Sequence, residues 1–265
     1  MRFAHVNGIV IHYRADGREG APTVVFSNSL GTDFRTWDGV VNILSDEFRC
    51  IRYDKRGHGL SQATPSPYRM EDHANDLAAL LRMLNVERAI VCGLSVGGMI
   101  AQLLASEHPG LVLALVLSDT AHKIGTREMW DSRIHAIENK GLEVVADGII
   151  ERWLSADFRN HRPYDTQGWR NMLTRTPVQG YLGTCAAIRD ADLTARTEKL
   201  AVPALCLCGS EDLATPPDHV QAMSKLIADA RFRLIAGAGH LPCVEKPQEF
   251  ADEMTRFFAE AELVR

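Results

Sequence analysis

Residues 90–99 read Ile90-Val91-Cys92-Gly93-Leu94-Ser95-Val96-Gly97-Gly98-Met99, an apolar run that enters a Gly-x-Ser-x-Gly turn. This order predicts a strand, a sharp turn with Ser95 at its tip, and a helix from Met99 to His108. Gly93 and Gly97 lack a Cβ, which lets other backbone approach the turn closely. The pattern predicts that Ser95 is a nucleophile near a helix N-terminus, where backbone amides can bind an oxyanion. A strand-to-helix turn with an incidental serine is the alternative on the pentapeptide alone.

The composition of the 265-residue chain excludes several classes of protein. Its net charge of −5 offers no basic patch, so no nucleic-acid partner is expected. The longest apolar run, Leu111–Leu117, is too short to cross a bilayer, so no membrane partner is expected. The six cysteines lack the spacing of a zinc site and predict no metal. They are expected to be reduced thiols, which indicates a cytoplasmic location.

Strand-like runs alternate with helical patterns in the two ends of the chain. Asn7-Gly8 predicts a hairpin between two short strands. Further strands are expected at 23–27, 48–53, 90–94, 111–118, 204–208 and 231–235, and helices at 34–44, 70–84 and 248–261. Because most of these strands are almost entirely apolar, the pattern predicts an α/β fold with a mostly parallel central sheet flanked by helices.

The middle of the chain has a different character. Residues 122–190 contain no strand-like run, are helical in pattern, and hold Trp130, Trp153 and Trp169. We interpret this segment as a helical cap, or lid, inserted into a core formed by residues 1–121 and 191–265.

A catalytic serine needs a general base and a group that orients that base. His240 lies in a glycine-containing loop directly after the strand at 231–235. Loops at the carboxyl ends of parallel strands meet at one edge of the sheet, which makes His240 the candidate base. His58 also follows a strand but lies between two glycines, and we interpret it as shaping its loop. His12, in a hairpin strand, is interpreted as structural or solvated, as are His73 and His108 in helices.

The acid that orients the base is predicted from the strand at 204–208. Asp212 follows this strand in Gly209-Ser210-Glu211-Asp212 and precedes two prolines. Glu211 and Asp119, which follows the strand at 111–118, stay open as alternatives. Ser95, Asp212 and His240 come in the chain order that α/β-hydrolases use.

With these residues in view, the chain resembles the α/β-hydrolase family and, within it, the 3-oxoadipate enol-lactonases. The resemblance covers nearly the whole length. Many relatives carry His-Gly where this chain has Asn28-Ser29, and the Asn-Ser-Leu-Gly version is similar to that of the lactonases. The motifs that carry the resemblance are Ser27-Asn28-Ser29-Leu30-Gly31, Tyr53-Asp54-Lys55-Arg56-Gly57-His58-Gly59-Leu60-Ser61, Gly93-Leu94-Ser95-Val96-Gly97-Gly98-Met99-Ile100-Ala101, Gly209-Ser210-Glu211-Asp212, Gly237-Ala238-Gly239-His240 and Glu245-Lys246-Pro247.

The resemblance implies hydrolysis of 3-oxoadipate enol-lactone to 3-oxoadipate in the β-ketoadipate pathway of bacterial aromatic catabolism. In that reaction Ser95 attacks the lactone carbonyl, while His240 accepts its proton. The backbone amides of Val96 and Leu30 are the expected oxyanion donors. No metal or organic cofactor is expected.

The partner implied is a small-molecule lactone that carries a carboxylate, so a cation is expected in the cap. On the helix expected at 128–140, Arg133 falls within an apolar arc with Trp130. Arg133, Trp130 and Trp153 are therefore the predicted substrate-binding residues, and arginine can hold a carboxylate with two parallel hydrogen bonds. An internal salt bridge of Arg133, or extension of its guanidinium into solvent, is the alternative.

Three further functions stay open at this point. A carbon–carbon bond hydrolase and a carboxylesterase would share most of these motifs. A non-catalytic ligand receptor would keep the pocket but would not need an intact triad. Assembly into a homo-oligomer is also left open.

Overall fold

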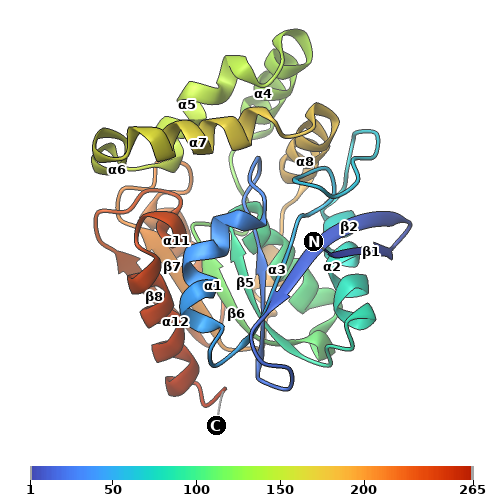
Figure 1. Ribbon diagram of the computed structural model, residues 1–265, viewed down its shortest axis with the longest axis vertical. Helices are drawn as coiled ribbons and strands as arrows, with labels where there is room; N and C mark the ends of the chain where they lie inside the picture. Colours follow the sequence, from blue (N-terminus) through green and yellow to red (C-terminus); the bar gives the residue numbers. More distant parts are fainter. Residues whose placement is uncertain (1, 264–265) are drawn as a thin grey trace.

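The computed structural model describes residues 2–263, which form one eight-stranded sheet with helices on both faces (Figure 1). The strand order is β1-β2-β4-β3-β5-β6-β7-β8. The pairs β1–β2 and β2–β4 are antiparallel, while all the other pairs are parallel. The strands are β1 (Arg2–Val6), β2 (Ile9–Asp16), β3 (Thr23–Ser27), β4 (Arg49–Tyr53), β5 (Ala89–Leu94), β6 (Val112–Ser118), β7 (Ala204–Gly209) and β8 (Ala230–Ile235).

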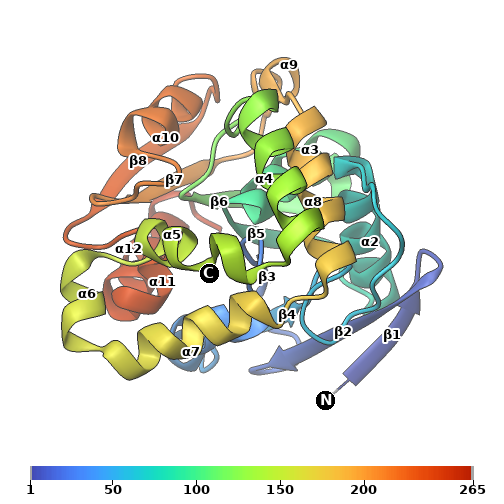
Figure 2. The ribbon, with the colours of Figure 1, turned by 90° about the horizontal axis from the view of Figure 1, so that it is seen from above.

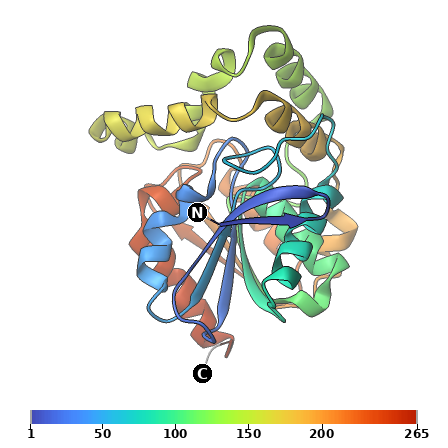
Figure 3. The same ribbon diagram turned by 45° about the vertical axis from the view of Figure 1, so that its right-hand side comes forward.

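The predicted α/β architecture, with a mostly parallel sheet flanked by helices, is confirmed. Every residue of β5 and of β7 is buried, as expected for strands covered on both faces. The hairpin of β1 and β2 forms one edge of the sheet (Figure 3).

Helices cover both faces of the sheet (Figure 2). On one face α1 packs against α11 and α12, and on the other α2 packs against α3. The core helices and 3-10 turns are η1 (Phe34–Trp37), α1 (Asp38–Leu44), α2 (Met70–Met83), α3 (Val96–Glu107), η2 (Pro109–Leu111), α9 (Thr194–Thr197), α10 (Pro217–Ser224), α11 (Pro242–Glu245) and α12 (Pro247–Glu260).

The segment between β6 and β7 folds into helices that lie over one edge of the sheet (Figure 1). It contacts the core at the loops that follow β3 and β4, where Gly31 lies against cap side chains and Gly57 against Gly180. We keep residues 122–190 as the proposed cap and 1–121 with 191–265 as the proposed core, of which residues 1 and 264–265 lie outside the described range. The cap helices are α4 (Arg127–Lys140), α5 (Glu143–Trp153), α6 (Ala156–His161), α7 (Pro163–Thr174) and α8 (Val178–Asp190).

Several element boundaries differ from the sequence prediction. The helix α3 begins at Val96, directly after the serine, rather than at Met99. The helix expected from Phe34 begins as a 3-10 turn and becomes α-helical at Asp38. Helix α10 was not predicted, because Pro216-Pro217 reads as a turn although proline also suits the first position of a helix.

Two further findings concern membrane-spanning helices and the cysteines. No helix within residues 2–263 combines the length and apolar character needed to span a membrane. All six cysteines are buried, and none of them forms a disulfide.

Candidate active site

Ser95 lies at a strained turn between β5 and α3. Its backbone has φ 58° and ψ −120°, a conformation that a residue with a side chain rarely adopts. A Cβ on Gly93 would lie 2.2 Å from the carbonyl oxygen of Gly97, and a Cβ on Gly97 would lie 2.0 Å from that of Ser27. The predicted need for two glycines around the serine is therefore confirmed.

Hydrogen bonds from β6 and the residues after it hold this turn in place. The Ser95 amide donates to the Ser118 carbonyl at 3.0 Å, and the Thr120 hydroxyl donates to the Ser95 carbonyl at 2.6 Å. Both bonds engage backbone atoms, so they fix the turn without occupying Oγ. The serine side chain stays available to a substrate.

His240 and Asp212 form a buried pair, with 2.9 Å between Nδ1 of the imidazole and Oδ2 of the carboxylate. Each residue is only 2% exposed. Asp212 also accepts hydrogen bonds from the Ala214 and Thr215 amides and from the Thr215 hydroxyl. Burial raises the pKa of Asp212, but the neighbouring His240 and these hydrogen bonds outweigh it and leave the pKa below its usual value. An ionised Asp212 holds the proton on Nδ1 and leaves Nε2 free to accept one.

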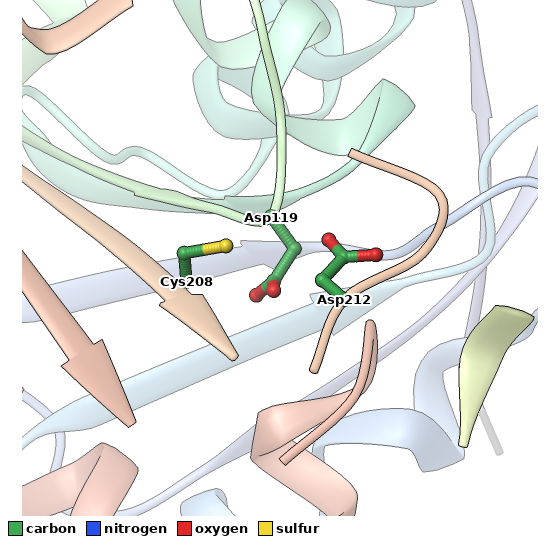
Figure 4. A group of neighbouring side chains, drawn as sticks. All are labelled: Asp119, Cys208 and Asp212. Carbon is green, nitrogen blue, oxygen red and sulfur yellow. The ribbon is translucent and has the colours of Figure 1, made fainter. Parts of the chain in front are cut away.

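Asp119, an alternative for the acid, lies beside Asp212 (Figure 4). The hydrogen bond of the His240 Nδ1 atom is to Asp212 and not to Asp119. It accepts a hydrogen bond from the Gly209 amide at 2.8 Å and another from the Ser118 hydroxyl. Burial and the adjacent charge of Asp212 raise the pKa of Asp119 well above its usual value. The two carboxyl groups therefore differ: the surroundings of Asp119 favour its neutral form, whereas those of Asp212 favour its charged form.

Asp119, Cys208 and Asp212 bring three potential metal-ligand atoms within 4.8 Å of one another (Figure 4). All four carboxylate oxygens already accept hydrogen bonds from the protein. Burial raises the pKa of the Cys208 thiol, which disfavours the thiolate that a metal needs. The three side chains therefore fit the surroundings of a catalytic acid better than a metal site.

The remaining candidates for the acid and the base are not part of the buried pair. Glu211 is exposed and forms no hydrogen bond to His240. His58 is fully buried, with Nδ1 3.1 Å from the Arg56 carbonyl, which fits the predicted role in shaping its loop. His12 is also buried, and its Nδ1 lies 2.7 Å from Oδ2 of Asp54 in the loop after β4, so His12 is structural rather than solvated.

Ser95 and His240 line one cavity of about 320 Å³ between core and cap. Leu30 and the three predicted cap residues, Arg133, Trp130 and Trp153, line the same cavity. A larger hollow of about 630 Å³ beside His12 contains no residue of the triad. Of the residues that the sequence proposed for the catalytic and binding site, all but Val96 and Asp212 line this cavity. Asp212 contacts the lining residue His240, and Val96 directly follows Ser95.

The sequence reasoning missed several residues that line the cavity, among them Arg152 and Tyr181. Arg152 directly precedes Trp153 on α5, so the prediction of Trp153 as a substrate-binding residue could have drawn attention to Arg152. Tyr181 gave none, because its place depends on how α8 packs beneath α4.

Arg133 points its guanidinium over the ring of Trp130, with 4.8 Å between Cζ and the ring centroid. Neither Arg133 nor Arg152 forms an ion pair with any residue that the structure describes, so the predicted alternative of an internal salt bridge is not supported. Burial raises the pKa of the Cys185 thiol to about 12, an effect that the charge of Arg133 partly offsets. The cavity is therefore lined by a positive charge that has no ion-pair partner among the described residues.

The two backbone amides predicted as oxyanion donors have no hydrogen-bond acceptor among the described residues. Val96 is the first residue of α3, where an amide has no partner within the helix. The Leu30 amide, in the loop after β3, donates to no other group within residues 2–263. A Cβ on the next residue, Gly31, would lie 2.6 Å from the Leu173 side chain of the cap, so this loop is packed tightly.

Comparisons with known proteins agree with this geometry. A family model described as the α/β-hydrolase fold matches residues 22–247. Two 3-oxoadipate enol-lactonases of Acinetobacter baylyi are similar to this chain. One is 30% identical over 91% of this chain and 90% of its own length. The other is 32% identical over 94% of this chain and 93% of its own length. The crystal structure of the enol-lactonase from Burkholderia xenovorans LB400 is 36% identical, with a TM-score of 0.94 over 97% of this chain and 100% of that one. A Pantoea ananatis protein named provisionally as the carbamate hydrolase RutD is 30% identical over 91% of this chain and 90% of its own.

Proposed function

Because the chain belongs to the α/β-hydrolase family and is a hydrolase, we propose that it opens 3-oxoadipate enol-lactone to 3-oxoadipate in bacterial catabolism of aromatic compounds. The cavity supports this substrate through its combination of groups. It joins a nucleophile and base with apolar walls and unpaired cap arginines. The substrate combines a reactive ester with a carboxylate, and both halves find a complementary group. The buried free thiols suit the cytoplasm, where we propose that the reaction occurs.

In the proposed reaction, Ser95 Oγ attacks the lactone carbonyl and its proton passes to Nε2 of His240. The amides of Leu30 and Val96 hold the oxyanion that develops on the carbonyl oxygen. The ring C–O bond then breaks and the enol oxygen leaves with the proton from His240. The enol converts to the ketone, which makes ring closure unfavourable. A water molecule that transfers its proton to His240 releases the acyl group from Ser95.

The cap arginines carry the substrate assignment within this proposal. Arg133 is half-buried, stacked on Trp130 and without a carboxylate partner among the described residues. A guanidinium in such surroundings gains most from a bound anion, because the local dielectric constant is below that of water. Arg152 supplies a second positive charge at the same cavity.

The test is a comparison of kcat/KM on purified protein for the enol-lactone, a dienoate carbon–carbon hydrolase substrate, p-nitrophenyl acetate and a small carbamate. We expect the lactone to give the highest value by far and to yield 3-oxoadipate. A higher value for the dienoate, the ester or the carbamate would assign the same triad to another substrate. Binding of the lactone without turnover would indicate a receptor.

A further inference from the structure

Lys55 is the most unusual charged group in the molecule. It lies in the loop after β4 and is only 1% exposed. Lysine is almost never buried without a partner, since an ammonium loses much of its hydration free energy on leaving water. The groups inside the protein that contact the ammonium of Lys55 must therefore explain its burial.

No carboxylate within residues 2–263 forms an ion pair with this ammonium. The two nearest candidates are already engaged: Asp54 accepts from His12 and from two backbone amides, and Asp33 forms a two-bond pair with Arg35. Within residues 2–263, the hydrogen-bond acceptor of Lys55 is the backbone carbonyl of Ser29, at 2.5 Å from Nζ. The Thr32 hydroxyl donates to the same carbonyl at 2.9 Å.

The carbonyl of Ser29 and the amide of Leu30 belong to one peptide unit. In a trans peptide the C=O and N–H bonds point in opposite directions. Lys55 therefore lies on one side of this peptide, while the Leu30 amide points away from it and lacks a partner among the described residues. A hydrogen bond to the oxygen of an amide draws electron density from its nitrogen and makes the N–H a stronger donor.

We propose that the buried ammonium of Lys55 strengthens the oxyanion hole by polarising the Ser29–Leu30 peptide. Lys55 is then a positioning and electrostatic residue that acts through the Leu30 amide and never touches the substrate. The inference rests on the proposed acyl transfer at Ser95 but not on the identity of the lactone. It applies to any ester that places an oxyanion at Leu30.

The charge on Lys55 makes this contribution dependent on pH. Burial lowers its pKa from 10.5 to about 7, although the charges of Asp54 and Asp33 oppose the shift. The other titratable groups that face it are His58 and His73, whose pKa values burial and the Lys55 charge both lower, so they stay neutral. The polarising charge is present below about pH 7 and is lost as the pH rises through that value. Because the catalytic base must be a neutral imidazole, kcat/KM should pass through a maximum.

The experiment measures kcat and KM of wild type, Lys55→Met and Thr32→Val against pH, with p-nitrophenyl acetate and the enol-lactone. Met has a similar length but no charge and no N–H. We expect Lys55→Met to lower kcat by about tenfold, less than the ~10²–10³-fold loss for removal of an oxyanion donor. The decline of kcat/KM on the alkaline side should disappear in this variant. Thr32→Val removes a neutral donor from the same carbonyl and should keep that decline.

A wild-type rate and pH profile in Lys55→Met would overturn the proposal. So would an equal loss at every pH with the alkaline decline retained, because that pattern describes a damaged loop. If Lys55→Met does not fold, Lys55→Gln keeps a neutral donor and should also lose the alkaline decline. Should the wild type hydrolyse only the ester, the lactone assignment fails while the test of Lys55 proceeds. If neither substrate reacts, the same comparison is made on the rate at which diisopropyl fluorophosphate inactivates the protein, and no inactivation would refute both ideas.

Discussion

Ser95 has a strained backbone conformation, which we relate to its proposed role as the nucleophile rather than to the packing of its side chain. A residue with a Cβ at φ 58° and ψ −120° costs on the order of 1–3 kcal/mol. Ser95→Ala keeps the Cβ and the strain, so its stability should equal that of the wild type while kcat falls about 10⁴-fold or more. Ser95→Gly should be equally inactive but more stable by about 1 kcal/mol. Glycine relieves the strain, and this gain outweighs the extra backbone entropy that glycine loses on folding. Thermal unfolding and turnover assays check both, and a Ser95→Gly protein no more stable than Ser95→Ala would contradict the strain.

The two buried aspartates should respond differently to the same substitution. Asp212→Asn removes the charge that holds the His240 tautomer, and kcat should fall about 10⁴-fold. The surroundings of Asp119 favour its neutral form, and it forms no hydrogen bond to His240, so Asp119→Asn should lower kcat less than tenfold. Steady-state kinetics on the two variants decide the assignment. A silent Asp212→Asn beside a crippled Asp119→Asn would show that Asp119 is the catalytic acid.

The cap arginines are tested by comparing charged and neutral substrates. Arg133→Met keeps the helix and loses a charge-assisted hydrogen bond worth about 1.5–3 kcal/mol, so kcat/KM for the carboxylated lactone should fall ~10–150-fold. Arg152→Met should show a smaller loss, because its side chain is more exposed. Turnover of p-nitrophenyl acetate should change little in either variant. Equal losses on both substrates would indicate that Arg133 supports the cap structure instead.

At the scale of elements, local signals predicted most of the fold. The nucleophile turn was readable because its glycines, its strand and its helix are contiguous in the chain. The Asp119–Asp212 contact was not readable, since it depends on the pairing of β6 with β7. Likewise, Asp54-Lys55-Arg56 reads as a polar loop, and only the packing of the cap and the β3 loop over it reveals a buried charge.

The junction of β5, α3 and β3 gives a prediction about packing. A methyl group at Gly97 would overlap the Ser27 carbonyl, so Gly97→Ala should destabilise the protein by more than ~3 kcal/mol or prevent folding. Gly148 is the matched control, because it lies within α5 and its missing Cβ faces open space. Gly148→Ala should stabilise the protein by ~0.5–1 kcal/mol through its higher helix propensity. Denaturant unfolding of both variants checks the pair, and a stable Gly97→Ala protein would contradict the close approach.

At the scale of the whole molecule, core and cap contribute different halves of the site. In the proposed site, the core supplies Ser95, His240, Asp212 and the amides of Leu30 and Val96 at the carboxyl edge of its sheet. The cap closes the cavity and supplies its positive charges. The Glu245 carboxylate links the two parts beside His240. It accepts a hydrogen bond from the Gly239 amide, in the loop of His240, and another from the Ser155 hydroxyl of the cap. Movement of the cap would therefore reach the base through this carboxylate.

Burial of the Lys55 ammonium should lower the free energy of unfolding of the whole protein. Its folded-state pKa of about 7 lies below the value of 10.5 for a free lysine, so between these pH values the unfolded chain binds a proton that the folded chain does not. This group should make the wild type least stable below about pH 7 and progressively more stable up to ~10.5. Lys55→Met lacks this dependence and should be more stable than the wild type near pH 6, with an advantage that shrinks towards about pH 9. Urea unfolding of the two proteins across that range measures the difference. A constant difference, or a variant that is less stable at every pH, would mean that Lys55 is not a buried charge tolerated for function but a group that the fold requires.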